Sequence, residues 1–267
     1  MSKQENLMSK WLVTIIYVIM LGTNAAAILI PLNGMTTQEV SDTYPNLFAP
    51  AGLTFAIWSV IYLLLAGFVI YQWLRPKRPS IMSEPSLSKK IRGLFIVSSI
   101  LNSVWLFAWQ YLQINLSVVI MLGLLMILIS LNRLLAKVAL TTKDRFFVRL
   151  PFSIYFGWIT IATIANITAF FVDKQIDFFQ NNQPIWTVIV LMIGLVIICA
   201  TILSNHNIAY GCATIWAYYG ILFKHQAQNG WNQAYPMIIL TVIGCIAVIV
   251  LVCIYESIQE FKRKKNV

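Results

Sequence analysis

Long hydrophobic runs, each about as long as a lipid bilayer is thick, recur along the chain and are separated by short polar stretches. A helix needs about 20 mostly apolar residues to cross roughly 30 Å of hydrocarbon. The pattern therefore predicts an all-α integral membrane protein with about eight transmembrane helices. The expected spans are residues 11–31, 52–74, 93–112, 115–136, 149–172, 185–204, 207–223 and 236–256.

Two of these runs allow another interpretation. The run over 207–223 is short and carries three tyrosines, so it is the least secure span. The run over 11–31 follows basic residues, and Ala25 and Ala27 resemble the cleavage site of a signal peptide. Its apolar stretch continues to Ile30, which is longer than the hydrophobic part of a signal peptide, so a first transmembrane helix is favoured.

Composition and charge exclude a soluble protein and fix an orientation. The chain has 267 residues, of which 59% are hydrophobic and 10% charged, more apolar surface than one soluble core can bury. The net charge of +10 is not a sign of nucleic-acid binding. All basic residues except Lys174 and Lys224 lie at the N-terminus, after the second and fourth spans, or in the tail. By the positive-inside rule both termini are expected in the cytoplasm, with a bacterial cell membrane as the expected location.

Two polar stretches organise the chain. The longest outer loop, Leu32 to Ala51, contains the apolar residues Leu47 and Phe48, which a mere linker would not need. Such a loop can fold over a helix bundle as a lid. A second polar stretch, Asp173 to Pro184, separates the first five spans from the last three. The predicted domains are therefore 1–178, a five-helix transmembrane domain, and 179–267, three further helices with a basic cytoplasmic tail.

Three tryptophans lie far from the expected span ends, although tryptophan is usually found at membrane interfaces. Trp58, for example, is eight residues into a span starting near Pro50, about 12 Å deep at about 1.5 Å per residue. Each has polar or aromatic neighbours at helical spacing. The stripes are Ala51, Phe55, Trp58, Tyr62 and Ala66; Ser98, Asn102, Trp105 and Trp109; and Tyr155, Trp158, Ala162 and Asn166.

These stripes have two interpretations. An amide facing lipid costs a few kcal/mol, so Asn102 and Asn166 are expected to point into the bundle. They can be hydrogen-bonding groups that hold packed helices together. They can equally line a cavity for a flat, mostly apolar ligand. No charged residue falls near a span centre, which argues against ion-coupled transport, and no nucleophile, phosphate-loop or metal-ligand motif is present, so no cofactor is expected.

Three stretches in these stripes resemble the TspO/MBR family of tryptophan-rich sensory proteins, whose eukaryotic members are called translocator proteins. The stretch from Pro50 to Trp58 is similar to a Pro-Pro-Gly motif leading to a tryptophan in helix two. Asn102-Ser-Val-Trp105 resembles an Asn-x-x-Trp in helix three, and Tyr155-Phe-Gly-Trp158 resembles helix five. The resemblance covers about the first 175 residues. The sequence departs from the family at Ala51 and Ile154, where prolines are expected.

The resemblance implies a five-helix bundle, a ligand pocket closed by the loop after helix one, and binding of porphyrins, sterols or related flat molecules. The last three spans then form a C-terminal extension. A membrane-embedded sensory or binding protein without enzymatic activity is the favoured function. The alternatives are a transporter or permease subunit for an apolar solute and, third, an enzyme acting on a porphyrin-like ligand. A homo-oligomer is left open. The expected ligand-binding residues are Phe55, Trp58, Tyr62, Asn102, Trp105, Trp109, Tyr155, Trp158 and Asn166.

Overall fold

The computed structural model describes residues 3–30, 32–74 and 80–265, and all regular secondary structure within them is helical. The basic residues Arg75, Lys77 and Arg78 of the second loop lie outside the described residues. The elements are α1 Lys3–Leu29, η1 Leu32–Gly34, α2 Thr37–Asp42, η2 Gly52–Ala56, α3 Ile57–Tyr71, η3 Ile81–Ser83, α4 Pro85–Gln110, α5 Ile114–Ala136, α6 Thr142–Asp144, η4 Arg145–Arg149, α7 Leu150–Asp173, α8 Asp177–Gln180, α9 Gln183–Asn205, α10 Ile208–Gln226 and α11 Pro236–Lys265.

Each of the eight expected spans coincides with a helix, which confirms an all-α, multi-pass membrane protein. Within the described residues, seven helical segments are long and apolar enough to cross a bilayer. The helix α10 is not among them, although it has 19 residues, because it is less apolar than the others. An eighth span at α10 therefore stays a prediction.

The chain divides into two compact units. Unit 1 comprises residues 1–40 and 58–156, and unit 2 comprises residues 41–57 and 157–267. The chain passes between them after Val40, at the start of α3 and within α7. This division differs from the domains 1–178 and 179–267 expected from the polar stretch at Asp173, whose independence stays a prediction.

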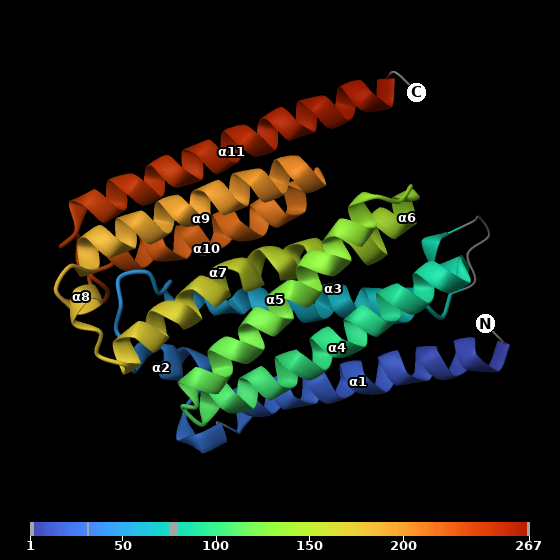
Figure 1. Ribbon diagram of the computed structural model, residues 1–267, viewed down its shortest axis with the longest axis horizontal. Helices are drawn as coiled ribbons and strands as arrows, with labels where there is room; N and C mark the ends of the chain where they lie inside the picture. Colours follow the sequence, from blue (N-terminus) through green and yellow to red (C-terminus); the bar gives the residue numbers. More distant parts are fainter. Residues whose placement is uncertain (1–2, 31, 75–79, 266–267) are drawn as a thin grey trace. The chain divides into compact units, whose positions relative to one another are not determined.

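In unit 1 the helices α1, α4 and α5 lie side by side, with α4 in contact with both others (Figure 1). A tight turn joins α4 to α5, and Leu112 adopts a left-handed conformation there with φ 58°. Buried leucines on α5 recur at helical spacing, including Leu124, Leu128, Leu131 and Leu135. The remaining faces of α5 are apolar too, as expected where lipid replaces water.

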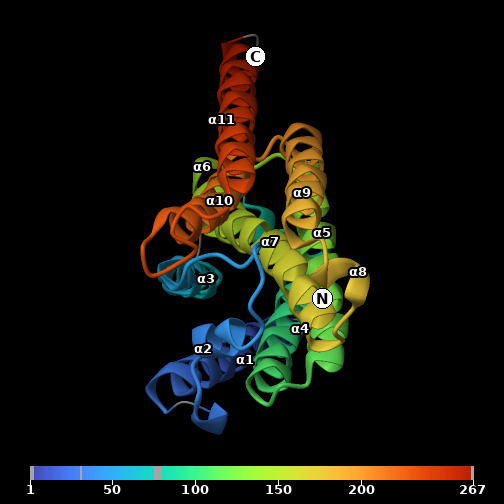
Figure 2. The same ribbon diagram turned by 90° about the vertical axis from the view of Figure 1, so that its left-hand side faces the viewer.

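In unit 2 the helices α9, α10 and α11 form a group that Figure 2 shows together. Small residues let their backbones come close. A Cβ atom placed on Gly157 of α7 would lie 2.6 Å from the Tyr210 carbonyl oxygen of α10. One placed on Gly194 of α9 would lie 2.6 Å from the Tyr218 hydroxyl oxygen of α10. Glycine is therefore required at both positions for α10 to pack as it does.

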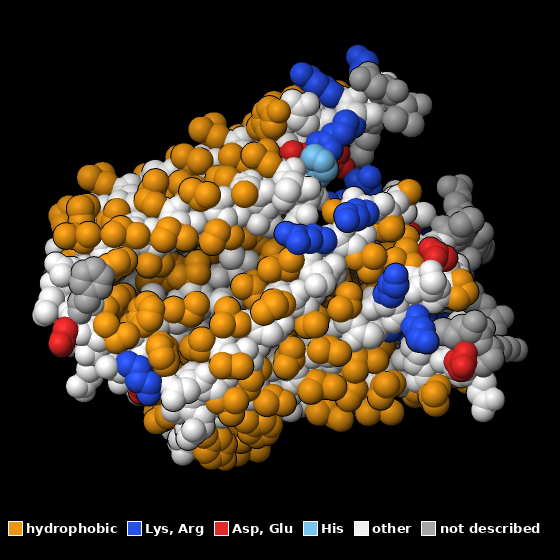
Figure 3. Space-filling model, viewed as in Figure 1, with side chains coloured by type: hydrophobic (Ala, Val, Ile, Leu, Met, Phe, Trp, Pro, Cys, Tyr) orange, Lys and Arg blue, Asp and Glu red, His pale blue; other side chains and the backbone are white. Residues whose placement is uncertain are grey.

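The outer surface agrees with a bilayer environment. Figure 3 shows hydrophobic side chains covering the middle of the helices, with Lys and Arg side chains toward helix ends. Large apolar side chains such as Leu63 and Leu240 are 75% and 70% exposed, which water would penalise and lipid does not.

Candidate ligand site

Six of the nine expected site residues lie together in unit 1. The Trp58 ring stacks on Tyr62, with centroids 5.6 Å apart, and on Trp105, at 6.2 Å. It also meets Tyr155 edge-on at 6.0 Å. The Trp105 ring stacks in turn on Trp109, at 5.8 Å. A continuous run of aromatic faces therefore joins α3, α4 and α7, and we call these five rings with Asn102 the aromatic–amide cluster.

A hydrogen-bonded chain runs along one side of this cluster. Asn102 is fully buried, as expected, and its side-chain oxygen accepts a hydrogen bond from Nδ2 of Asn24 at 2.8 Å. Its own Nδ2 donates to the Tyr155 hydroxyl at 3.1 Å. Asn24 of α1 was not among the site residues expected from the sequence, although a lone amide inside an apolar run is a detectable signal. The amide of Asn102 is thus held in one orientation from both sides.

The neighbouring helices fix the cluster in place through backbone carbonyls. The Tyr17 hydroxyl of α1 donates to the Tyr62 carbonyl at 2.9 Å. At the other end of the stack, Nε1 of Trp109 donates to the Thr37 carbonyl at the start of α2 at 3.0 Å. Side chains from α1, α3 and α4 and the backbone of α2 therefore all determine where the rings lie.

Two groups of the cluster, the Tyr62 hydroxyl and the Trp105 indole, are buried without a hydrogen-bond partner among the described residues. Trp105 has the group that can only donate. Its side chain is only 5% exposed, yet Nε1 has no hydrogen-bond partner among the described residues. The indole N–H can only donate, and leaving a buried donor unpaired costs about 1–3 kcal/mol. Buried donors without partners are rare enough to need a reason. An acceptor atom supplied by a bound ligand would provide such a reason.

The other three expected site residues belong to unit 2. The Phe55 ring meets Trp158 edge-on, with centroids 5.8 Å apart, and Asn166 is 2% exposed. Trp58 lies in the first turn of α3, directly after the 3-10 helix η2, and its depth in the bilayer stays a prediction. The nine residues thus form two groups, of six and three.

The outer loop is ordered within unit 2 from residue 41 onward. The side-chain oxygen of Asn46 accepts hydrogen bonds from the backbone N–H groups of Phe48, at 3.1 Å, and Ala49, at 2.8 Å. The apolar residues Leu47 and Phe48 are 2% and 1% exposed. Burial of these two side chains is what the sequence suggested for a loop that folds back onto the protein, and the role of a lid stays a proposal.

The helix α10 holds this segment mainly through main-chain atoms. Nε1 of Trp216 donates to the Thr54 carbonyl at 3.0 Å, and the Ala51 N–H donates to the Gly220 carbonyl at 3.0 Å. A Cβ atom on Gly220 would fall on the side chain of Thr54. We call these contacts, with the two described next, the α10 anchor. The spacing of residues along α10 did not reveal which segment these residues contact.

Two polar side chains at the end of α10 complete the anchor. Nε2 of His225 donates to the Leu47 carbonyl at 2.9 Å, and Lys224 forms an ion pair with Asp42 at 3.2 Å. His225 lies beyond residue 223, where the expected span ends. Burial lowers the pKa of His225 below its ordinary value, the hydrogen bond to Leu47 opposes this shift, and the charge of Lys224 adds to it. The imidazole is therefore neutral near pH 7.

The described residues contain no group of three His, Cys, Asp or Glu side chains that could hold a metal ion. What the cluster offers chemically is aromatic faces, one oriented amide and one unpaired N–H donor.

The helices and the buried cluster define a multi-pass helical membrane protein. The model of the TSPO-like protein family matches residues 10–255, so the chain belongs to that family. The match continues through α9, α10 and most of α11, which corrects the expectation that the likeness ends near residue 175. Comparison with curated proteins and with solved structures gives no match.

Proposed function

We propose that this TSPO-like protein is a membrane-embedded sensory or binding protein, without enzymatic activity, for a flat apolar ligand such as a porphyrin or a sterol-like molecule. The observation that carries the proposal is the buried Nε1–H of Trp105, which has no partner among the described residues and lies within stacked rings. An apolar ring system would pack against these rings, and one acceptor on it would pair with this donor.

The hydrogen bonds that hold Asn102 would fix the orientation of a ligand in the proposed site. Because Asn24 and Tyr155 occupy both ends of the Asn102 amide, that amide stays fixed beside the rings whether or not a ligand is present. Fixed polar groups in an apolar site orient a ligand without an ordering cost. The three residues of unit 2, Phe55, Trp158 and Asn166, keep their proposed ligand role from the sequence.

The test is a titration of the full chain in lipid nanodiscs with protoporphyrin, followed by quenching of tryptophan fluorescence. The variant Trp105→Phe keeps a flat ring but removes the N–H, so we expect the affinity to fall about fivefold to tenfold, as for one lost hydrogen bond of about 1–1.5 kcal/mol. Trp11→Phe is the control, since Trp11 is 54% exposed. Unchanged affinity in folded Trp105→Phe and Asn102→Leu variants would leave only a packing role.

A transporter or permease subunit for an apolar small molecule is the second candidate. One observation favours it: buried polar side chains occur along most of the length of α4. They are Ser88, Arg92, Ser98, Ser99, Asn102 and Gln110. Uptake of a fluorescent porphyrin into proteoliposomes, above that of protein-free vesicles, would favour transport over binding alone.

We also propose that both termini lie in the cytoplasm and the 32–51 loop outside, which requires α10 to cross the membrane. A cysteine at the exposed position Asp42 should then react with an impermeant maleimide in whole cells, in a background without native cysteines. A cysteine in the tail should react only after lysis. Labelling of both in intact cells would contradict eight spans.

A further inference from the structure

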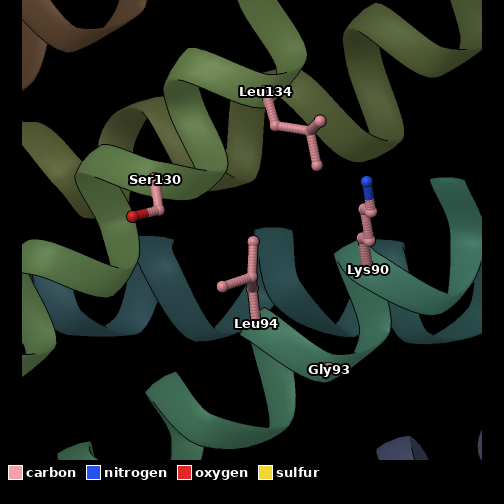
Figure 4. A pocket seen from close by; sticks show the side chains of 5 residues that line it. All are labelled: Lys90, Gly93, Leu94, Ser130 and Leu134. Atoms are coloured by element: carbon pink, nitrogen blue, oxygen red, sulfur yellow. The ribbon is translucent and has the colours of Figure 1, made fainter.

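A groove with a volume of about 470 Å³ lies on the surface of unit 1, between the antiparallel helices α4 and α5. Its lining is apolar except for one charged and one hydroxyl side chain. Figure 4 shows Lys90 and Leu94 rising from α4 toward α5, with Leu134 reaching toward them from α5. The groove is separate from the aromatic–amide cluster, and neither the family match nor the proposed function assigns it a role.

The charge at one end of the groove has no ion-pair partner among the residues that the structure describes. The described residues supply no ion pair for Lys90 or for Lys137, and both side chains are exposed. Lys137 ends α5 and lies three residues beyond Leu134, so helical spacing places it on the face of α5 that carries Ser130 and Leu134. The basic side chains therefore lie at one end of the groove, near the start of α4 and the end of α5.

The apolar lining of the groove leaves room for an acyl chain. A Cβ atom placed on Gly93 would have nothing within 4 Å, so the groove is open at that point. The Ser130 hydroxyl donates to the Met126 carbonyl at 2.8 Å, which leaves its oxygen able only to accept hydrogen bonds. Leu94 and Leu134 complete a surface that suits hydrocarbon and not water.

We propose that this groove binds one anionic phospholipid, with its phosphate at Lys90 and Lys137 and the first part of an acyl chain over Gly93, Leu94 and Leu134. The occupant follows from charge complementarity: the groove has an apolar lining, and its charged end lies near the first turns of α4 and the last turn of α5, where the basic side chains are. Basic pockets between membrane helices are known to hold anionic headgroups.

The experiment is native mass spectrometry of the full chain released from nanodiscs of equimolar phosphatidylglycerol and phosphatidylcholine. Wild-type protein should retain phosphatidylglycerol in preference to phosphatidylcholine. Lys90→Gln should lower the retained phosphatidylglycerol about fivefold, because one basic side chain near an anionic surface contributes about 1 kcal/mol. Gly93→Leu should lower it also, by filling the open floor without removing charge.

The matched control is Lys89→Gln, which removes the same charge from the next residue of α4, an exposed side chain that does not line the groove. It should retain phosphatidylglycerol as the wild type does. Equal losses in Lys89→Gln and Lys90→Gln would overturn the proposal in favour of a diffuse charge effect. Full retention in both Lys90→Gln and Gly93→Leu would overturn it too.

A further measurement distinguishes binding of a lipid from binding of a free phosphate compound. Glycerol phosphate added at 10 mM should not displace the retained phosphatidylglycerol, since it has no acyl chain to occupy the groove. Displacement would show that the site recognises the phosphate alone and would overturn the commitment to a lipid. Thermal unfolding of each variant in the same nanodiscs must match the wild type, so that loss of lipid is not loss of fold.

Discussion

The two units hold their aromatic residues in different ways. In unit 1 the central contacts are between side chains, as in the chain from Asn24 through Asn102 to Tyr155. In unit 2 the α10 anchor reaches mainly backbone carbonyls, those of Leu47 and Thr54. A side-chain network depends on the identity of both partners, whereas a bond to a carbonyl survives most changes of the accepting residue. The Asn24–Asn102–Tyr155 chain of unit 1 therefore depends on particular side chains, and the α10 anchor of unit 2 depends on them less.

The two units also differ in how closely their helices pack at glycine residues. Glycines at positions 157, 194 and 220 allow α10 to approach its neighbours within unit 2. In unit 1, Gly67 and Gly123 would accept a Cβ atom at ordinary contact distances of 3.5 Å and 3.7 Å. Added bulk should therefore damage unit 2 more, and altered polarity should damage the cluster of unit 1 more.

The largest expected effect is that of ending the chain after residue 181, which removes α9, α10 and α11. Segment 41–57 loses every contact of the α10 anchor, so we expect rapid proteolysis within 41–57, while quenching of the unit 1 tryptophans by protoporphyrin persists. Limited proteolysis with mass spectrometry measures the first, and the fluorescence titration the second. A chain shortened only by residues 258–267 is the control.

The same truncation distinguishes the two divisions of the chain. If residues 1–178 form an independent module, as the sequence suggested, segment 41–57 stays protected after the cut. Protection of that segment together with retained binding would contradict the importance of the α10 anchor.

A smaller but local effect is expected from Gly220→Val. The new side chain would meet Thr54, and overpacking of this kind costs about 1–3 kcal/mol of stability. Denaturant unfolding in detergent would measure the loss. Gly244→Val on α11 of the same unit is the matched control, because nothing lies within 4 Å of a Cβ atom there. Equal stability of the two variants would show that the close approach at Gly220 does not matter.

Polarity can be tested in unit 1 by a double-mutant cycle. Asn24→Leu and Asn102→Leu should each destabilise the protein by about 1–2 kcal/mol, because each leaves a buried partner unpaired. The double variant should lose less than the sum, with a coupling of about 0.6 kcal/mol, the average for hydrogen bonds in membranes. Unfolding free energies of the four proteins provide the measurement. Strict additivity would mean that the bond between Asn24 and Asn102 contributes nothing.

The smallest expected effect is a pH dependence of the anchor at His225. Because its pKa is lowered in the folded state, the stability it contributes is complete above the ordinary value of 6.5 and is lost as the pH falls below it. Protonation would place a positive charge in a buried site beside the positive charge of Lys224. Hydrogen exchange of the Phe48 and Ala49 amides, corrected for intrinsic rates, should therefore rise between pH 7.5 and 5.5.

His225→Gln provides the comparison for this experiment, since its amide can donate to the Leu47 carbonyl but does not titrate. Exchange in that variant should not change with pH after correction. A parallel rise in both proteins would assign the effect to other groups.

The helices could be predicted from the sequence because each span is set by its own local run of apolar residues. Burial of Asn102 followed from the cost of an amide in lipid, and burial of Leu47 and Phe48 from the position of apolar residues in a polar loop. The 3-10 helix η2 could not be predicted in this way, because the apolar run continues through Gly52–Ala56 and gives no sign that the α-helix begins only at Ile57.

The partners of the site residues were not predictable from spacing within one helix. Asn24 and Trp216 each act on a residue from another part of the chain, and helical periodicity contains no information on which helices meet. The family resemblance located the motifs but not these contacts. The unpaired N–H of Trp105 is also a property of the packed structure, since it depends on what surrounds the ring.

The α10 anchor also has a consequence for biogenesis. The residues that it joins are far apart in the chain, by 162 positions between Thr54 and Trp216 and by 178 between Leu47 and His225. At about 5–20 residues per second, a ribosome needs about 10–35 s to make the intervening chain. During that time segment 41–57 has left the ribosome without its partner, and the first helices are already in the membrane. Every newly made molecule therefore lacks the contacts of the α10 anchor until α10 has been synthesised.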